Sequence, residues 1–268
     1  MRDKNFINDD KKALQGTLLG FFGDVVAQLL LILVVTIIAS IVLSIASPGL
    51  DSAEVTIKIS GFLKNNIVAG ILGVFTSLVV LLGFVLIIGK NKLIRLVETV
   101  FTRKALIYGV GGFLSIIAFM VLYNVLVIQG FGLDTPANQD AVVDMVKARP
   151  ITSFLLVCVL GVLIEELTYR YSLFGGLLRK NKVLAYVISA IVFMFIHSIA
   201  SFSAEMSANG AITSEIWKQM ATMPPYAFSG LVLCYVYEKS ESLGSPLIAH
   251  FLNNFLVYIG VVLPLLVS

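Results

Sequence analysis

Long apolar runs alternate with short polar segments along most of the chain. Crossing a bilayer as a helix takes about 20 consecutive apolar residues. Six runs reach this length, at 21–46, 66–89, 105–128, 151–170, 183–202 and 246–267. A shorter run at 226–238 becomes a seventh span if its flanks join it. The pattern predicts an all-α fold, a polytopic transmembrane helix bundle of about seven spans.

The composition supports insertion into a membrane. Of 268 residues, 58% are hydrophobic and 13% are charged, and the mean hydropathy is +0.97. Soluble domains carry about 25% charged residues. We therefore expect a single integral membrane domain over residues 1–268, with N-terminal spans in 1–150 and a motif-bearing core in 151–268. Because the first apolar run is too long for the core of a signal peptide, no cleavable signal is predicted.

The distribution of basic residues predicts how the chain lies in the membrane. With seven alternating spans, 14 of the 19 Lys and Arg residues fall on the side of the N-terminus and 5 on the other. The positive-inside rule then places the N-terminus in the cytoplasm, and we expect the cell membrane as the location. The basic connection at 90–104 has the apolar spacing of a helix, and 129–150 is predicted as the most polar loop. No basic patch suggests nucleic acid.

Ionisable side chains next to or inside these apolar runs are the first candidates for function. Within a membrane they are costly, about 2.5–3.5 kcal/mol for a central Asp, Lys or Arg, and they usually face a protein interior or a water-filled cavity. Glu165 and Glu166 follow an apolar run, with Arg170 four residues after Glu166. Glu166 and Arg170 share a helical face and are predicted to pair. Glu165 points about 100° away and needs another partner.

The two histidines of the sequence also lie in apolar surroundings. Phe193 and His197 share one helical face at i, i+4, and His250 and Asn254 share another. A carboxylate in a low-dielectric cavity can act as a general base. A histidine and an amide directed at one point can donate hydrogen bonds to a developing oxyanion. Three helices would thus deliver these groups and Glu165 into one pocket.

These motifs resemble those of the CPBP family. This family comprises CAAX-prenyl endopeptidases and bacteriocin-processing or bacteriocin-immunity membrane proteins, also called Abi proteins or intramembrane glutamic proteases. The resemblance covers about residues 150–260. It rests on three motifs in this order: Glu165-Glu166-x-x-x-Arg170, Phe193-x-x-x-His197 and His250-x-x-x-Asn254.

The resemblance implies an endopeptidase that acts on membrane-associated or leader-type peptides. Glu165 with His197 would activate a water for attack on a peptide carbonyl, without a covalent acyl-enzyme. His250 and Asn254 would form the oxyanion hole. No metal or other cofactor is implied, and the expected partners are a peptide or protein substrate and the lipid bilayer. The residues implied to support the site structurally are Glu166, Arg170 and Phe193.

Three other functions stay open at this point. A non-catalytic member of the family, a membrane scaffold or bacteriocin-immunity protein, would keep the motifs for structure. Glu165, His197 and His250 could instead bind zinc, although the His-Glu-x-x-His motif is absent. A proton-coupled transporter could use the Glu–His pair as a relay, but no internal repeat supports it. Cys158 and Cys234 are interpreted as small buried hydrophobes.

The expected spans set one geometric condition for the site. They place Glu165 and His250 towards the inner side of the membrane and His197 nearer the outer side. The pocket forms only if the motif helix continues beyond Arg170, or if the fifth span is shifted or tilted. The charge count favours, without deciding, a pocket that opens to the cytoplasm.

Overall fold

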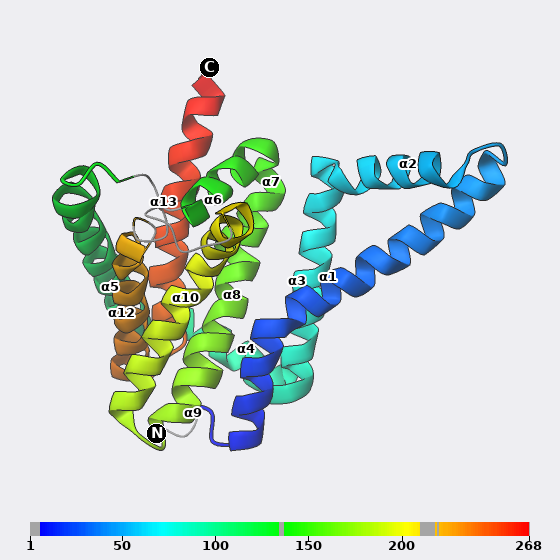
Figure 1. The fold of residues 1–268 in the computed structure, drawn as a ribbon. Helices are drawn as coiled ribbons and strands as arrows, with labels where there is room; N and C mark the ends of the chain where they lie inside the picture. The colour runs from blue at the N-terminus through cyan, green and yellow to red at the C-terminus, as the bar shows by residue number, and fades with distance from the viewer. Residues whose placement is uncertain (1–5, 134–136, 210–217, 219, 268) are drawn as a thin grey trace.

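The computed structural model is a bundle of long helices with a helical arm at one side (Figure 1). It describes residues 6–133, 137–209, 218 and 220–267. Every regular element in these ranges is a helix, which confirms the all-α prediction. In chain order the elements are α1 (Asp10–Ala46), α2 (Ser52–Lys64), α3 (Asn66–Ile88), α4 (Lys90–Glu98), η2 (Thr99–Phe101), α5 (Arg103–Tyr123), η3 (Asn124–Gln129), α6 (Ala137–Ala148), α7 (Pro150–Ser153), η4 (Phe154–Leu160), α8 (Gly161–Glu165), η5 (Glu166–Phe174), α9 (Gly175–Leu178), α10 (Lys182–Asn209), α12 (Pro224–Ser240) and α13 (Gly244–Val267).

The long helices confirm a polytopic membrane protein of about seven spans. Six stretches of the described chain are long and apolar enough to cross a membrane, and each overlaps an expected span. The remaining expected span, 226–238, lies inside α12, a helix of 17 residues that contacts α5 and α10 within the bundle. The six stretches are Asp10–Ala46, Asn66–Ile88, Arg103–Gln129, Pro150–Leu178, Lys182–Ile199 and Gly244–Val267.

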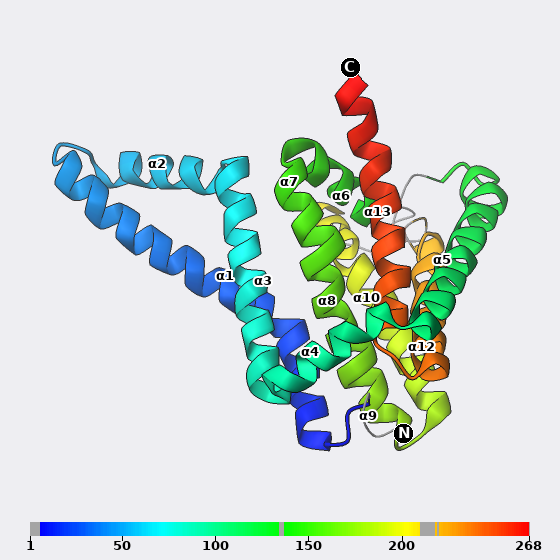
Figure 2. The same ribbon diagram turned by 180° about the vertical axis from the view of Figure 1, so that it is seen from behind.

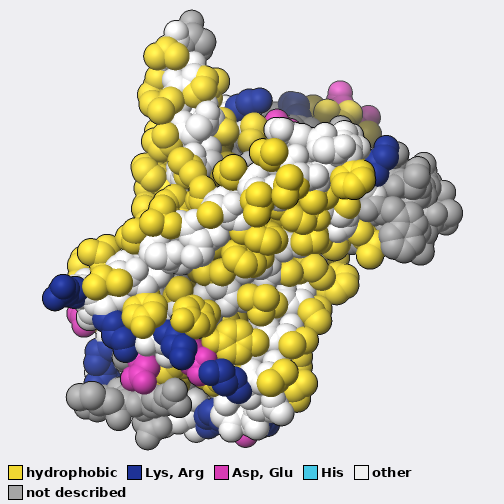
Figure 3. Space-filling view, turned by 90° about the vertical axis from the view of Figure 1, so that its left-hand side faces the viewer, with side chains coloured by type: hydrophobic (Ala, Val, Ile, Leu, Met, Phe, Trp, Pro, Cys, Tyr) yellow, Lys and Arg dark blue, Asp and Glu magenta, His cyan; other side chains and the backbone are white. Residues whose placement is uncertain are grey.

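The surface has the distribution expected of a membrane protein. Hydrophobic side chains cover the middle of the face seen in Figure 3, and Lys and Arg side chains gather at its lower end. This is the end that carries α4 and α9 in Figure 1. An apolar belt next to a basic end is typical of a helix bundle in a bilayer.

α1, α2 and α3 form the arm (Figures 1 and 2). The first half of α1 lies against η5 through Gly16 and Gly20, where a Cβ would overlap the side chains of Ser172 and Thr168. Small residues four apart allow helices to approach closely in a membrane. The second half of α1 leaves the bundle, and no residue from 24 to 46 is buried. This half of the helix is therefore free to face lipid.

The motif helix is continuous from α7 to α9 and includes two stretches of π-helix, η4 and η5. Gly161 makes the first of these possible, because a Cβ there would overlap the carbonyl oxygen of Leu156. π-helical turns are frequent at functional sites, and η5 begins at Glu166. The helix continues past Arg170 to Leu178. Such a continuation was one of the two ways in which the pocket could form from the expected spans.

The N-terminal segment closes one end of the bundle. Ile7 is 1% exposed, and the Phe6 ring lies 4.7 Å from the ring of Tyr237. Lys92 on α4 donates a hydrogen bond of 3.3 Å to the carbonyl oxygen of Phe6. Burial lowers the pKa of the Lys92 amine. Chain segments far apart in sequence thus pack together below the motif helix.

Candidate active site

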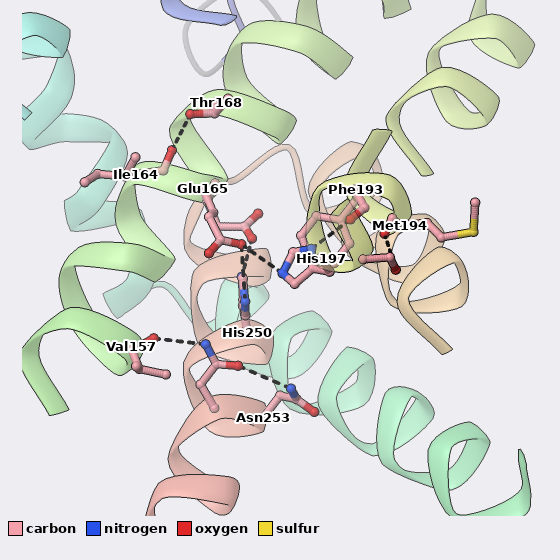
Figure 4. Close-up of polar contacts among 12 residues, drawn as sticks. Val157, Ile164, Glu165, Thr168, Phe193, Met194, His197, His250 and Asn253 are labelled. Atoms are coloured by element: carbon pink, nitrogen blue, oxygen red, sulfur yellow. Dashed lines mark hydrogen bonds and ion pairs between the residues drawn. The ribbon is translucent and has the colours of Figure 1, made fainter. Parts of the chain in front are cut away.

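Glu165, His197 and His250 meet in the interior of the bundle (Figure 4). Oε2 of Glu165 lies 3.6 Å from Nε2 of His197 and 3.8 Å from Nε2 of His250. The three side chains come from α8, α10 and α13, and their exposed fractions are 31%, 16% and 6%. The structure therefore brings Glu165 together with both histidines of the sequence motifs.

The His197 ring is held on both sides. Its Nδ1 lies 2.7 Å from the carbonyl oxygen of Phe193. A carbonyl oxygen only accepts hydrogen bonds, so Nδ1 carries the hydrogen and, in the neutral ring, Nε2 presents a lone pair to Glu165. The ring also stacks on Tyr226, with centroids 5.2 Å apart and planes at 21°. The tautomer and the orientation of His197 are thereby fixed.

His250 is attached to the motif helix through Glu166. Its Nδ1 lies 2.7 Å from Oε1 of Glu166, and the same oxygen accepts a hydrogen bond of 3.2 Å from Arg170. The side chains of Glu166 and Arg170 are 0% and 1% exposed. The predicted pairing of these two residues is confirmed. The hydrogen bond from His250 was not anticipated, because spacing along one helix says nothing of a partner on another.

Phe193 lies at the centre of this group. The guanidinium carbon of Arg170 is 4.4 Å from the centroid of the Phe193 ring and 5.7 Å from that of Tyr169, distances at which a cation is attracted to an aromatic face. The same Phe193 ring lies edge-on to His250 at 6.0 Å. The Phe193 ring separates the buried Glu166–Arg170 pair from His197. This position fits the structural role expected for Phe193, and that role stays a prediction.

Asn254 also reaches the site, with one donor already engaged. Its Nδ2 donates a hydrogen bond of 2.9 Å to the carbonyl oxygen of Val157 on η4, and its Oδ1 accepts one of 3.3 Å from Asn253. The bond to Val157 holds α13 against the motif helix. An amide nitrogen has two hydrogens, so Asn254 retains a second one to donate.

A cavity of about 240 Å³ connects these residues. Glu165, Phe193, His197, His250 and Asn254 all line it, together with side chains that the sequence did not indicate. Part of its wall comes from α6, so the expectation of a polar loop over 129–150 is wrong for this helix. Pro224 and Pro225 mark the start of α12 in the sequence, and they were the available signal for Tyr226, which follows them. The polar side chains among the missed lining residues are Gln139, Tyr226, Ser229 and Asn253.

Within the described ranges, no group of three or more His, Cys, Asp or Glu side chains has the arrangement of a metal site. Whether Glu165, His197 and His250 bind zinc stays a prediction to be tested. Cys158 and Cys234 are both buried free thiols, as the sequence indicated.

Fold and site together define a polytopic membrane protein with a partly buried carboxylate and two histidines facing one cavity. The model of a protein family described as type II CAAX prenyl endopeptidase Rce1-like matches residues 147–256. This segment carries all three motifs. The resemblance to CAAX-type membrane proteases is thereby confirmed for this part of the chain.

Two curated proteins are similar to the same chain. The membrane-embedded CAAX protease MroQ of Staphylococcus aureus (strain USA300) is 23% identical over 152 residues, 55% of this chain and 55% of that protein. YdiL of Bacillus subtilis (strain 168), named as a candidate membrane peptidase, is 23% identical over 123 residues, 46% of this chain and 42% of YdiL. The chain thus spans about half the length of the curated relatives it matches. No solved structure gives a significant match. Both relatives carry peptidase names, which does not favour a scaffold.

Proposed function

We propose that this protein is an intramembrane endopeptidase that hydrolyses peptide bonds with a water activated by Glu165, without a metal and without a covalent acyl-enzyme. The observation that carries the proposal is the convergence of Glu165 Oε2 with the Nε2 atoms of His197 and His250, at 3.6 and 3.8 Å, beside a cavity. Hydrogen bonds to water are about 2.7–3.0 Å long, so the 3.6 Å between Glu165 and His197 is short enough for one water to bridge these two side chains. The Rce1-like match supports the reaction class.

In the first step Glu165 and His197 act on the same water. The hydrogen on Nδ1 of His197 is committed to the Phe193 carbonyl, so its Nε2 accepts a hydrogen bond from the water. Glu165 removes a proton from that water as general base. The water oxygen forms a bond to the carbonyl carbon, and the carbonyl oxygen becomes an oxyanion.

His250 and Asn254 stabilise this oxyanion. His250 already donates from Nδ1 to Glu166, so in its doubly protonated form it donates from Nε2 into the cavity. Asn254 supplies the second donor, with the amide held in place by the Val157 carbonyl. Donors that are fixed before the charge develops contribute most to stabilising it.

In the last step the protonated Glu165 returns its proton to the departing nitrogen. The oxyanion re-forms the carbonyl group as the C–N bond breaks, which gives a carboxylic acid and an amine. The acid then passes its proton to the amine, so that the products are a carboxylate and an ammonium group. No side chain forms a bond to the substrate. Glu166, Arg170 and Phe193 take no part in the proton transfers and position His250 from behind.

We place the protein in the cell membrane with its N-terminus in the cytoplasm. The basic residues that gather at the end with α4 and α9 support this orientation (Figure 3), because cytoplasmic segments are enriched in Lys and Arg. The expected substrates are membrane-associated or leader-type peptides.

The test is a cleavage assay on the purified protein in detergent with a pooled library of leader-like and lipidated peptides, read by mass spectrometry. We expect cleavage that survives a strong chelator and is absent with Glu165→Gln. Cleavage that is lost to the chelator and restored by zinc would replace the proposal with a zinc site at Glu165, His197 and His250. A folded protein that cleaves no peptide in the library counts against a peptidase.

A further inference from the structure

The cavity extends from Glu165 towards one end of the bundle. Its wall towards α6 includes Gln139 and Val142 of α6, Val257 of α13 and Tyr226 in the first turn of α12, whose ring stacks on His197. We call these four residues the α6 mouth. α6 lies at the upper end of the bundle in Figures 1 and 2, the end that also carries α2. A substrate that reaches Glu165 along the cavity therefore enters at this end.

The opposite end is closed by packing. Leu167, Phe174, Tyr237 and Leu243 are each 0% exposed and form one cluster with Ile7 of the N-terminal segment. The cavity has no described lining residue from α4, from α9 or from the N-terminal segment. The buried Glu166–Arg170 pair lies on this side of Glu165 as well. No described feature thus offers a route to the site from this end.

The closed end is also the basic end. It carries Lys11, Lys12, Lys90, Lys92, Arg95, Arg103, Lys104, Arg179, Lys180, Lys182 and Lys239 of the described residues. The end with the α6 mouth carries Lys58, Lys64, Lys147, Arg149 and Lys218. The positive-inside rule assigns the more basic end to the cytoplasm. The α6 mouth then faces away from the cytoplasm, opposite to the side that the charge count alone favoured.

We infer that the site takes its substrate from the extracytoplasmic side of the membrane, and that this substrate is an apolar, uncharged stretch of an exported peptide. That the site has a peptide substrate rests on the proposed function. The side from which the site is reached follows from the cavity and the charges alone. A reaction that moves the peptide across the membrane must then precede cleavage.

The chemistry of the lining sets the kind of peptide. Apart from Glu165 and the two histidines, no ionisable carboxylate, lysine or arginine is among the described lining residues. Ile116, Met120, Leu156 and Leu233 add apolar surface near the site. Burying a charged side chain without a partner is costly. We therefore expect apolar residues on both sides of the cleaved bond.

Cysteine labelling in intact bacterial cells tests the side of access without requiring catalysis. Gln139→Cys places a thiol at the α6 mouth, Lys58→Cys places one on the exposed face of α2, and Lys180→Cys places one at the basic end, where the lysine is 66% exposed. Cys158 and Cys234 are buried, so the unmodified chain sets the background. The probe is a membrane-impermeant maleimide, applied before and after permeabilisation.

The inference predicts that Gln139→Cys and Lys58→Cys are labelled in intact cells and that Lys180→Cys is labelled only after permeabilisation. Labelling of Gln139→Cys only after permeabilisation would overturn it. A Gln139→Cys chain that is unlabelled in both conditions would overturn it too, because the α6 mouth would then be closed to water.

A second arm separates this inference from the proposed function. A membrane-tethered reporter displays the same apolar peptide either outside the cell or in the cytoplasm, and is expressed with the wild-type chain or with Glu165→Gln. We expect cleavage of the outer reporter alone, and only by the wild-type chain. Cleavage of the cytoplasmic reporter alone would overturn the inference and leave the peptidase proposal standing. Labelling as expected with no cleavage on either side counts against the peptidase proposal only.

Discussion

Oε1 of Glu166 accepts hydrogen bonds from two cationic or potentially cationic groups, Nδ1 of His250 at 2.7 Å and Arg170 at 3.2 Å. Glu166 and His250 are 84 residues apart in sequence, and the carboxylate is completely buried. One oxygen atom therefore ties the last helix to the motif helix and fixes the ring that faces Glu165. Folding and the arrangement of the site depend on the same contact.

Neutralising Glu166 should separate these two effects. Glu166→Gln keeps the shape of the side chain but leaves the Arg170 charge uncompensated. Loss of one partner of a buried ion pair costs about 3–5 kcal/mol, so we expect a marked fall in the melting temperature in detergent. In the double variant Glu166→Gln with Arg170→Met, the buried charge is gone and most of the stability should return. Turnover should stay low because His250 still lacks its carboxylate partner.

A double-mutant cycle on melting temperature and turnover measures this coupling. If Glu166→Gln melts like the wild-type chain, the ion pair does not stabilise the fold. If the double variant recovers full turnover, the Glu166–His250 hydrogen bond does not position the histidine.

His197→Ala should abolish turnover without unfolding the protein. The change removes the Nε2 atom that faces Glu165, and general acid–base groups contribute about 10²–10⁴-fold to rate. The substitution also leaves space beside Tyr226, so added imidazole should restore part of the rate. Size-exclusion chromatography checks the fold. Turnover at the wild-type rate, with no response to imidazole, would remove His197 from the mechanism.

His250→Ala and Asn254→Ala should each lower kcat by about 10²-fold or more, the effect of losing an oxyanion donor. KM should change little, since the donors act on charge that develops in the transition state. Leu256→Ala, at a 49% exposed position of the same helix, is the matched control and should leave kcat unchanged. A rise in KM with constant kcat would assign these residues to substrate binding.

Gly20→Ala should destabilise the protein, whereas Gly61→Ala should not. Alanine normally favours a helix over glycine by about 1 kcal/mol, and nothing lies within 4 Å of a Cβ at Gly61. At Gly20 the new methyl group would overlap Thr168, whose hydroxyl donates to the Ile164 carbonyl. Overpacking of this kind costs about 1–3 kcal/mol. Equal melting temperatures for the two variants would contradict the close packing of α1 on the motif helix.

The spans and the pairing within the motif helix could be predicted because they depend on local patterns. Runs of apolar residues predicted each long helix, and the i, i+4 spacing predicted the Glu166–Arg170 contact that the structure contains. The continuation of the motif helix to Leu178 could be given only as a condition for the pocket, because polar residues after Arg170 interrupt the apolar pattern there.

Contacts between distant segments could not be predicted in this way. The hydrogen bond from His250 to Glu166 and the stacking of Tyr226 on His197 depend on how helices are rotated and placed against each other. α6 was missed because it is polar and short, and its contribution to the cavity wall depends on the return of the chain over the bundle.

The most direct test of the central claim compares Glu165→Gln with Glu98→Gln on one cleaved peptide, at equal amounts of folded protein. Glu98 is an exposed glutamate of α4, so the two variants make the same chemical change inside and outside the site. The account predicts that kcat/KM falls by about 10²–10⁴-fold for Glu165→Gln and is unchanged for Glu98→Gln, with or without a chelator. Wild-type kcat/KM in the Glu165→Gln protein would contradict the assignment of Glu165 as the general base.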